Sequence, residues 1–366
     1  MKKKMLYIIL LLVVAALAAA GCATLRSVGR TPRGARLERV KQSPHYVDGH
    51  FRNTSETPQM TGDRGFFPAL WEFLFDNRPD LKPKEAVPTV KTNLNAFGRD
   101  EEVVVWLGHS SVFIQTGGRR FLFDPVLTCK FPTSLFMRPF KGAAIYTPDD
   151  IPEVDCLVVT HDHWDHLDYA TIRALRSKVG MVVCSLGIGE NFAYWGYPEA
   201  MIHDVEWGED VAVGDITLHC LPARHFSGRL SGSGKTFWGS YLIDGPVRRI
   251  FVSGDGGYDT HFADIGRQFP GIDLAIMENG QYDPDWKYIH TTPDLLPQAI
   301  DDLGPKRVMS YHNAKFALAN HPWTEPMELL LNASEGRSWE LLTPKIGQEV
   351  LLDTHPSFTP WWRDGR

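Results

Sequence analysis

The chain has 366 residues, of which 43% are hydrophobic and 22% charged, a composition typical of a globular protein with a sizeable core. Its formal net charge is −6, so no global basic field favours nucleic acid, and we expect no nucleic-acid partner. The sequence leaves the oligomeric state open.

The first residues have the pattern of a bacterial-type export signal. Three lysines at positions 2–4 precede an apolar run from Leu6 to Ala20, and the next two residues are glycine and Cys22. This ending resembles a lipoprotein box, so we expect a signal over 1–21 and lipidation of Cys22. The protein would then be a membrane-anchored lipoprotein of the cell envelope, facing the periplasm. Cleavage after Ala20 ranks second, and an uncleaved anchor ranks third because a membrane span needs about 20 apolar residues.

Two segments separate this signal from the main domain. Residues 22–60 are polar, rich in Arg, Ser, Gly and Thr and without a clear period, which predicts a tether. In residues 61–90, Phe66, Leu70 and Leu74 fall on one helical face, which predicts an N-terminal helical extension. Packing of this helix on the main domain is favoured over contact with lipid.

Residues 91–355 alternate short β-rich runs with helical patterns, as in packed sheets flanked by helices, and 356–366 form a C-terminal tail. Strands are predicted at 103–107, 112–115, 121–124, 155–160, 182–184, 216–221, 239–243, 250–253, 274–277 and 307–310. Helices are predicted at 168–179, 261–268, 292–303 and 324–334. The third helix should have a disturbed start, since it contains Pro293 and Pro297.

The stretch THDHWDHLD, residues 160–168, joins a predicted strand to a predicted helix and ends on a residue suited to the helix N-cap. Alternate residues of extended chain point the same way, so His161, His163 and Asp165 converge while His166 turns aside. Imidazoles and a carboxylate at this spacing suit zinc, and one loop could supply two metal sites. A solvated polar loop is the weaker interpretation.

Three further candidate ligands each follow a β-like run. They are His225, Asp255 and His312, and Asp255 lies between glycines that permit a sharp turn. A single histidine at a strand end is usually structural. Three candidates in equivalent places, in a chain that already holds the histidine-rich loop, favour a metal site instead.

This ordered set, beginning with Asp124, resembles the metallo-β-lactamase superfamily. Within it, WLGHSS at 106–111, PARHFSGR at 222–229 and SGDGGY at 253–258 are similar to N-acyl-phosphatidylethanolamine-hydrolysing phospholipase D and its bacterial relatives. The resemblance spans about 45–331. It implies an α+β fold, a four-layer αββα sandwich with a two-metal cleft at one edge of the paired sheets.

The resemblance also implies two Zn²⁺ per chain, although this ligand set does not exclude iron or manganese. Seven residues would be ligands: His161, His163 and His225 for one ion, Asp165, His166 and His312 for the other, and Asp255 as a bridge. Asp124 and His109 would lie behind the ligands and orient them. Asp165 and Asp255 are the catalytic candidates, the former to move a proton.

Candidates for contact with substrate are Trp164, His290 and His321. Trp164 stands where the phospholipase has another aromatic residue, and the two histidines could bind phosphate or protonate a leaving group. For each histidine, an ordinary surface role is equally favoured. The apolar stretch 131–140 could enter a bilayer or line an acyl groove, but a loop that covers the core is slightly favoured.

We therefore expect a zinc-dependent phosphodiesterase of the phospholipase D type that cleaves N-acylated phosphatidylethanolamine, or a related phospholipid, through a metal-bridging hydroxide. Its partners would be a phospholipid or another small ester and, through the lipid anchor, a membrane. The alternatives are a di-zinc hydrolase of a lactone, thioester or β-lactam, a non-catalytic metal-binding lipoprotein, and a redox di-iron site.

Overall fold

The computed structural model describes residues 2–62, 80–130, 133–230 and 232–364. The residues on which the helical extension was predicted, Phe66, Leu70 and Leu74, lie outside the described residues. The body of the protein is built on two seven-stranded sheets.

The first sheet has the order β18-β3-β4-β5-β6-β7-β8. Its strands are β3 Val103–Gly108, β4 Ser111–Thr116, β5 Arg119–Phe123, β6 Val154–Val159, β7 Val179–Ser185, β8 Ile202–Val205 and β18 Glu349–Leu351. The pairs from β18 to β5 are antiparallel, and those from β5 to β8 are parallel.

The second sheet repeats this arrangement in the order β17-β16-β15-β14-β13-β10-β9. Its strands are β9 Asp210–Val213, β10 Ile216–Leu221, β13 Ser240–Asp244, β14 Arg249–Val252, β15 Leu274–Glu278, β16 Arg307–Tyr311 and β17 Glu340–Leu342. The pairs from β9 to β14 are antiparallel, and those from β14 to β17 are parallel.

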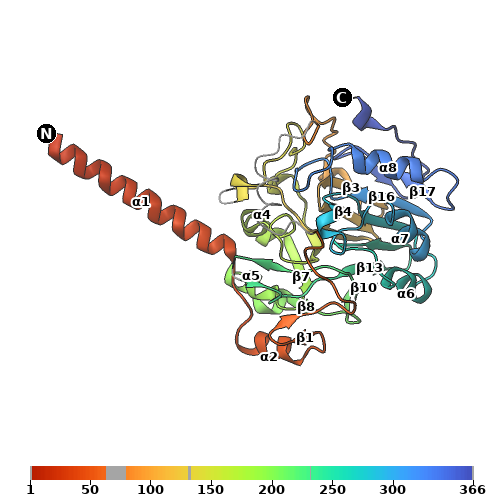
Figure 1. Ribbon diagram of the computed structural model, residues 1–366, viewed down its shortest axis with the longest axis horizontal. Helices are drawn as coiled ribbons and strands as arrows, with labels where there is room; N and C mark the ends of the chain where they lie inside the picture. The colour runs from red at the N-terminus through yellow and green to blue at the C-terminus, as the bar shows by residue number, and fades with distance from the viewer. Residues whose placement is uncertain (1, 63–79, 131–132, 231, 365–366) are drawn as a thin grey trace.

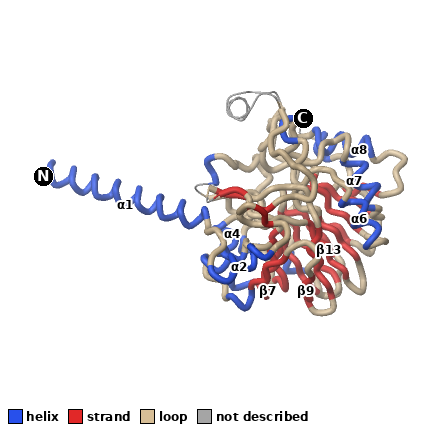
Figure 2. Tube along the Cα trace, turned by 60° about the horizontal axis from the view of Figure 1, so that its bottom comes forward, coloured by secondary structure: helices blue, strands red, loops and turns tan. Residues whose placement is uncertain are grey.

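Each sheet buries both faces, because alternate residues of a strand point to opposite sides. In β3, Val104 and Trp106 face the second sheet and join the central core, whereas Val103 and Val105 pack against the helices outside. Those helices are α4 Tyr169–Leu175 and α5 Gly189–Tyr194 on the first sheet, and α6 His261–Gln268, α7 Leu296–Leu303 and α8 Glu325–Ala333 on the second. Figure 2 shows α6, α7 and α8 together on one side of the body and α4 on the other. The predicted αββα sandwich is confirmed.

The N-terminal segment begins with α1 Lys2–Val28, which projects from the body in Figure 1. Across the described part of the chain, no helix has both the length and the apolarity that crossing a membrane requires.

The structure differs from the expected tether over much of residues 22–60. Helix α2 Gly34–Gln42 and the strand pair β1 Tyr46–Val47 and β2 His50–Phe51 fold onto the body. Val40 and Phe51 are buried there with Phe237 and Trp238. Only a few apolar residues anchor the segment, so its overall polar composition concealed them. The predicted tail behaves similarly, since Trp361 and Trp362 are buried in the central core.

The contribution of α2 to the stability of the fold can be tested at Arg36. Its guanidinium donates to Asp204 Oδ2 at 2.7 Å and lies 2.9 Å from Glu199, and the Arg36 side chain is only 12% exposed. We expect Arg36→Ala to lower the free energy of unfolding by about 2–4 kcal/mol, because buried Asp204 loses its charged partner. Urea denaturation measures this change.

Arg267→Ala is the matched control, because Arg267 pairs with Asp264 where both side chains are more than half exposed. Its effect should stay below about 0.5 kcal/mol. Equal effects of the two substitutions would contradict a stabilising role for α2.

Candidate metal centre

The candidate ligands meet where strands of both sheets end. The loop 160–168 connects β6 to α4, and Asp168 caps the helix by accepting a hydrogen bond from the Thr171 N–H. Asp255 follows β14 and His312 follows β16, both in the second sheet, and His225 follows β10. Because these strand ends share one edge of the sandwich, residues far apart in sequence become neighbours.

The first cluster consists of His161, His163 and His225. Nε2 of His161 lies 2.9 Å and Nε2 of His225 lies 3.2 Å from Nδ1 of His163. His225 Nδ1 is 2.7 Å from the Ile289 carbonyl oxygen, so Nδ1 carries the proton and Nε2 is free to bind a metal. Three imidazole nitrogens therefore converge on one point.

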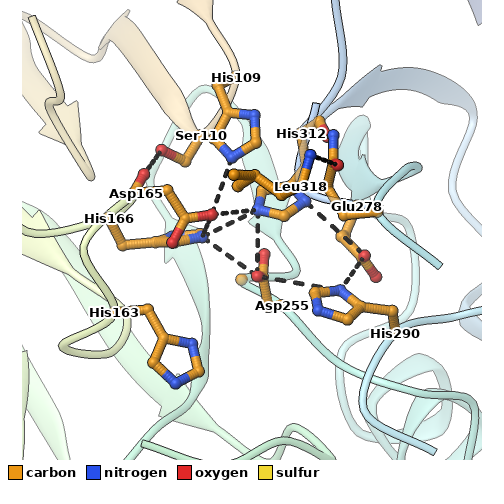
Figure 3. A network of polar contacts seen from close by, with 12 residues as sticks. His109, Ser110, His163, Asp165, His166, Asp255, Glu278, His290, His312 and Leu318 are labelled. Atoms are coloured by element: carbon orange, nitrogen blue, oxygen red, sulfur yellow. Dashed lines mark hydrogen bonds and ion pairs between the residues drawn. The ribbon is translucent and has the colours of Figure 1, made fainter. Parts of the chain in front are cut away.

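The second cluster consists of Asp165, His166, Asp255 and His312 (Figure 3). Asp255 Oδ2 is 3.2 Å from His166 Nε2 and 3.1 Å from His312 Nε2. The same oxygen is 3.9 Å from His161 Nε2 and 4.0 Å from His225 Nε2 in the first cluster. Asp255 thus lies between the two clusters, which is the place expected of a bridging ligand.

Asp124 and His109 support the second cluster from behind. Asp124 accepts hydrogen bonds from the Thr160 N–H at 2.8 Å and from His166 Nδ1, also at 2.8 Å. His109 Nε2 is 2.9 Å from Asp165 Oδ2. His109, Asp124 and His312 all have positive φ, at 53°, 41° and 68°. Such strained backbone concentrates at functional sites, where surrounding contacts maintain it.

The histidines of the first cluster are electrically neutral. Burial, reinforced by the neighbouring imidazoles, lowers the pKa of His161 and His225 well below the ordinary value. Burial also lowers the pKa of His163. Neutral imidazoles offer lone pairs to a metal ion.

In the second cluster the balance is reversed. Burial opposes charge on His166 and His312, but the carboxylates around them outweigh it. The pKa of His166 is raised well above its ordinary value, and that of His312 is raised to about 9. Burial likewise opposes charge on Asp255, yet His166 and His312 lower the pKa of this carboxyl well below its usual range.

These residues fit a divalent metal. The second cluster gathers anionic oxygens around imidazole nitrogens, and a cation would take the place of the protons on His166 and His312. Asp255 Oδ1 is buried without a hydrogen-bond partner in the described part of the chain. A buried carboxylate oxygen without a partner is costly unless something else compensates it. The two clusters are therefore able to bind metal, whereas the number and identity of the ions remain predictions.

Asp124→Asn tests the support behind the ligands. The amide can still accept from Thr160, but it cannot replace the charge that holds His166, so we expect metal affinity to fall about 10–100-fold. Competition with a chromogenic chelator measures the dissociation constant. Asp155→Asn at the start of the same β6 strand is the control. Unchanged affinity in Asp124→Asn would contradict the orienting role.

The other predicted site residues fall in different environments. The Arg229 guanidinium lies over the Trp164 indole, with the Arg229 Cζ atom 3.9 Å from the centroid of the ring. His290 Nδ1 is 2.7 Å from Glu278 Oε1 and 4.0 Å from Asp255 Oδ2, so His290 does border the centre (Figure 3). His321 has both ring nitrogens occupied, by the Gln281 N–H at 2.8 Å and the Pro322 carbonyl at 2.9 Å. Neither nitrogen of His321 is free for phosphate.

Glu278 is a site residue that sequence reasoning missed. It is the last residue of β15 and is 2% exposed, and burial raises the pKa of its carboxyl. Its place at the end of a predicted strand, like Asp255 and His312, was the signal that could have found it.

Two cavities flank the centre. The larger, about 1080 Å³, is lined by residues on both sides of His290, including Tyr288 and Thr292, and by Tyr258, Tyr282 and His321. The smaller, about 500 Å³, is lined by the candidate ligand His225 and by residues 50–59 of the N-terminal segment.

Comparisons with known proteins show the family to which this chain belongs. A β-lactamase superfamily domain matches residues 119–313, more than half of the chain. An uncharacterised protein of Mycobacterium tuberculosis is 34% identical over 94% of this chain and 96% of its own. N-acyl-phosphatidylethanolamine-hydrolysing phospholipase D 1 of Caenorhabditis elegans is 31% identical over 63% of this chain and 69% of its own. The outer membrane protein RomA of Klebsiella pneumoniae is 54% identical over 28% of this chain and 76% of its own.

Among solved structures, CmlA, a diiron β-hydroxylase from Streptomyces venezuelae, matches with a TM-score of 0.53 and 19% identity over 69% of this chain and 54% of its own. This likeness shows a shared fold. The sandwich and its metal-binding clusters define a metal-dependent hydrolase. The chain belongs to the metallo-β-lactamase superfamily, and within it the chain resembles N-acyl-phosphatidylethanolamine-hydrolysing phospholipase D.

Proposed function

We propose that this protein is a zinc-dependent phosphodiesterase of the phospholipase D type, acting on N-acylated phosphatidylethanolamine or a related phospholipid. The observation that carries the proposal is the buried cation of Arg229 beside the metal loop, by which we mean residues 160–168. Nε and Nη1 of Arg229 have no hydrogen-bond partner among the described residues, while Nη2 donates to the Leu167 carbonyl at 2.9 Å. Burial lowers the pKa of Arg229 to about 10, so the group stays charged near neutral pH.

A guanidinium with unused donors favours an anionic substrate, because phosphate oxygens can accept two parallel N–H bonds from it. Because Nε and Nη1 are buried, a substrate phosphate would reach them only after the side chains that cover them move. A neutral lactone or thioester offers no such charge. The phospholipase activity in the name of the C. elegans relative supports the same substrate class.

Exposed apolar side chains support a lipid substrate. Leu135 and Phe136 are 66% and 49% exposed, and Leu230 is 79% exposed. The rings of Phe136 and Trp164 meet edge-on, with their centroids 6.0 Å apart. Leu230 follows Arg229 in the sequence, and the Arg229 guanidinium lies over the same indole. Phe136 therefore borders the loop 160–168, where this exposed ring could contact an acyl chain. Cell-envelope location through a lipidated Cys22 remains part of the proposal, and the name of the RomA relative supports it.

When bound, two zinc ions would activate a water nucleophile near neutral pH and neutralise charge on the phosphoryl oxygens. The chain's own residues would position the substrate and move protons. Arg229 would hold the phosphate against the metal loop. The Asp165 side chain is 13% exposed, against 2% for Asp255, so its carboxylate is the more open of the two and would accept a proton.

The test is hydrolysis by metal-loaded protein of a panel comprising an N-acyl phosphatidylethanolamine in mixed micelles, a simple phosphodiester, a lactone and a β-lactam. We expect the N-acyl phospholipid to be cleaved with release of phosphatidic acid. Activity should disappear in His163→Ala and fall in Arg229→Met, which should retain its metal. Cleavage of only the lactone or β-lactam would overturn the proposal in favour of a carbonyl hydrolase.

A further inference from the structure

The loop that carries His225 is long and has little secondary structure of its own. It runs from the end of β10 at Leu221 to the start of β13 at Ser240, and its described residues contain only the short pair β11 Gly228–Arg229 and β12 Gly232–Ser233. The Ile289 carbonyl fixes the imidazole of His225, but this ring bond does not hold the main chain of His225 itself. The loop is held at neighbouring positions, where the Gly257 N–H donates to the Arg224 carbonyl at 2.9 Å and the Gly228 N–H donates to Asp162 Oδ1 at 2.8 Å. A metal ligand keeps its geometry only if both its side chain and its main chain are held in place.

Asn53, from the N-terminal segment, supplies the second restraint. Its Nδ2 donates to the His225 carbonyl at 2.7 Å, and its Oδ1 accepts from the His225 N–H at 3.1 Å. Oδ1 also accepts from Trp238 Nε1 at 3.0 Å. One carboxamide thus satisfies both main-chain groups of the ligand, as a neighbouring strand would.

The arrangement requires an asparagine. A flipped amide would place its NH₂ group against two N–H donors and its oxygen against a carbonyl, so the hydrogen bonds fix the orientation. An aspartate could accept from His225 and Trp238, but its second oxygen would face the His225 carbonyl oxygen.

The residues around Asn53, which we define as the strap, 49–57, are attached on both sides of His225. Before the ligand, Arg224 donates to the Glu56 carbonyl at 2.6 Å and to Thr57 Oγ1 at 3.0 Å. After it, Lys235 Nζ donates to the Gly49 carbonyl at 2.7 Å, and the Phe51 N–H donates to the Gly234 carbonyl at 2.8 Å. Phe51 is 4% exposed.

We propose that Asn53 is a positioning residue for the metal ligand His225, and that the strap is therefore part of the metal centre. The strap lies outside the β-lactamase superfamily match at 119–313, the range that contains all seven candidate ligands. This inference concerns the centre itself and does not depend on which substrate is cleaved.

The test compares Asn53→Ala with Lys235→Met, which also removes a strap contact but none to His225. Metal dissociation constants are measured by chelator competition, and ligand geometry is read from the visible spectrum of the cobalt-substituted protein. We expect Asn53→Ala to weaken binding of one metal ion about 10–100-fold and to change the cobalt spectrum. Lys235→Met should keep the metal dissociation constant within twofold of that of the unmodified protein and leave the cobalt spectrum unchanged.

Thermal unfolding of the metal-free variants separates this role from general stabilisation. If Asn53→Ala does not fold, Asn53→Asp gives the decisive result, because it keeps two of the three hydrogen bonds and should still weaken metal binding. Unchanged affinity and spectrum in the variant that folds would overturn the proposal. Equal weakening by Lys235→Met would overturn it as well. Since no substrate enters these measurements, failure of the proposed phospholipase activity would leave their outcome unaffected.

Discussion

Asp255→Ala is expected to lower kcat/KM by about 10⁴-fold. Asp255 Oδ2 lies 3.1–4.0 Å from imidazole nitrogens of both clusters. In the proposed two-metal centre, its loss would remove the bridging ligand and the negative charge that offsets the charge of the ions. Metal content, measured by elemental analysis, should fall together with the activity.

The matched control is Asp264→Ala on the surface of α6, where the carboxylate is 61% exposed. This variant should retain full activity and metal. If Asp255→Ala kept two metal ions and a tenth or more of the activity, Asp255 would not be the bridge between the clusters.

Glu278 and His290 are expected to act as one unit. The 2.7 Å contact between Glu278 Oε1 and His290 Nδ1 places the imidazole proton on Nδ1, which makes Nε2 the acceptor in the neutral ring. We expect Glu278→Gln and His290→Ala each to lower kcat by about 100-fold, the usual contribution of a positioned acid–base or orienting pair.

A double-mutant cycle checks this coupling. The double variant should be about as slow as either single variant, because each substitution already disables the pair. Metal content should be unchanged in all three. Multiplicative losses, or a fully active Glu278→Gln beside an inactive His290→Ala, would show that Glu278 does not position His290.

Packed sheets flanked by helices were predictable because the long strands have strong local patterns, whereas the αββα sandwich was predicted from the resemblance to the superfamily. The predicted run 103–107 corresponds to β3, which is apolar on both faces. The run 216–221 corresponds to β10, where Ile216, Leu218 and Cys220 enter the central core and alternate with partly buried polar residues. The short edge strands β8, β9, β17 and β18 were not predicted, because three or four residues carry too little periodicity. Helix α7 starts only at Leu296 with Pro297 in its first turn, as the disturbed start anticipated.

The helix after the metal loop was predicted too long. α4 ends at Leu175, a 3₁₀ turn follows, and Val179 already pairs with Val154 at the start of the strand ladder. The β-branched side chain and its buried partner outweigh the helical spacing that extended the prediction to residue 179.

The residues of the candidate centre likewise divide into those that local sequence patterns indicated and those that only the fold brings together. His161, His163, Asp165 and His166 are close in sequence, so their spacing indicated a site before any fold was known. Asn53 gave no signal, because its role depends on hydrogen bonds to a residue 172 positions away. The strap was mistaken for a tether because it is attached by a few polar side chains, main-chain groups and the single buried ring of Phe51, and these contacts leave no trace in composition.

The most direct measurement is metal stoichiometry paired with activity on an N-acyl phospholipid. Metal-free protein would be titrated with zinc while bound metal and hydrolysis are recorded together. The two clusters predict about two ions per chain, with hydrolysis of the phosphodiester reaching its maximum only when both are bound. A fully active protein with no metal, or a protein that binds two ions and leaves every phosphodiester intact, would contradict the account.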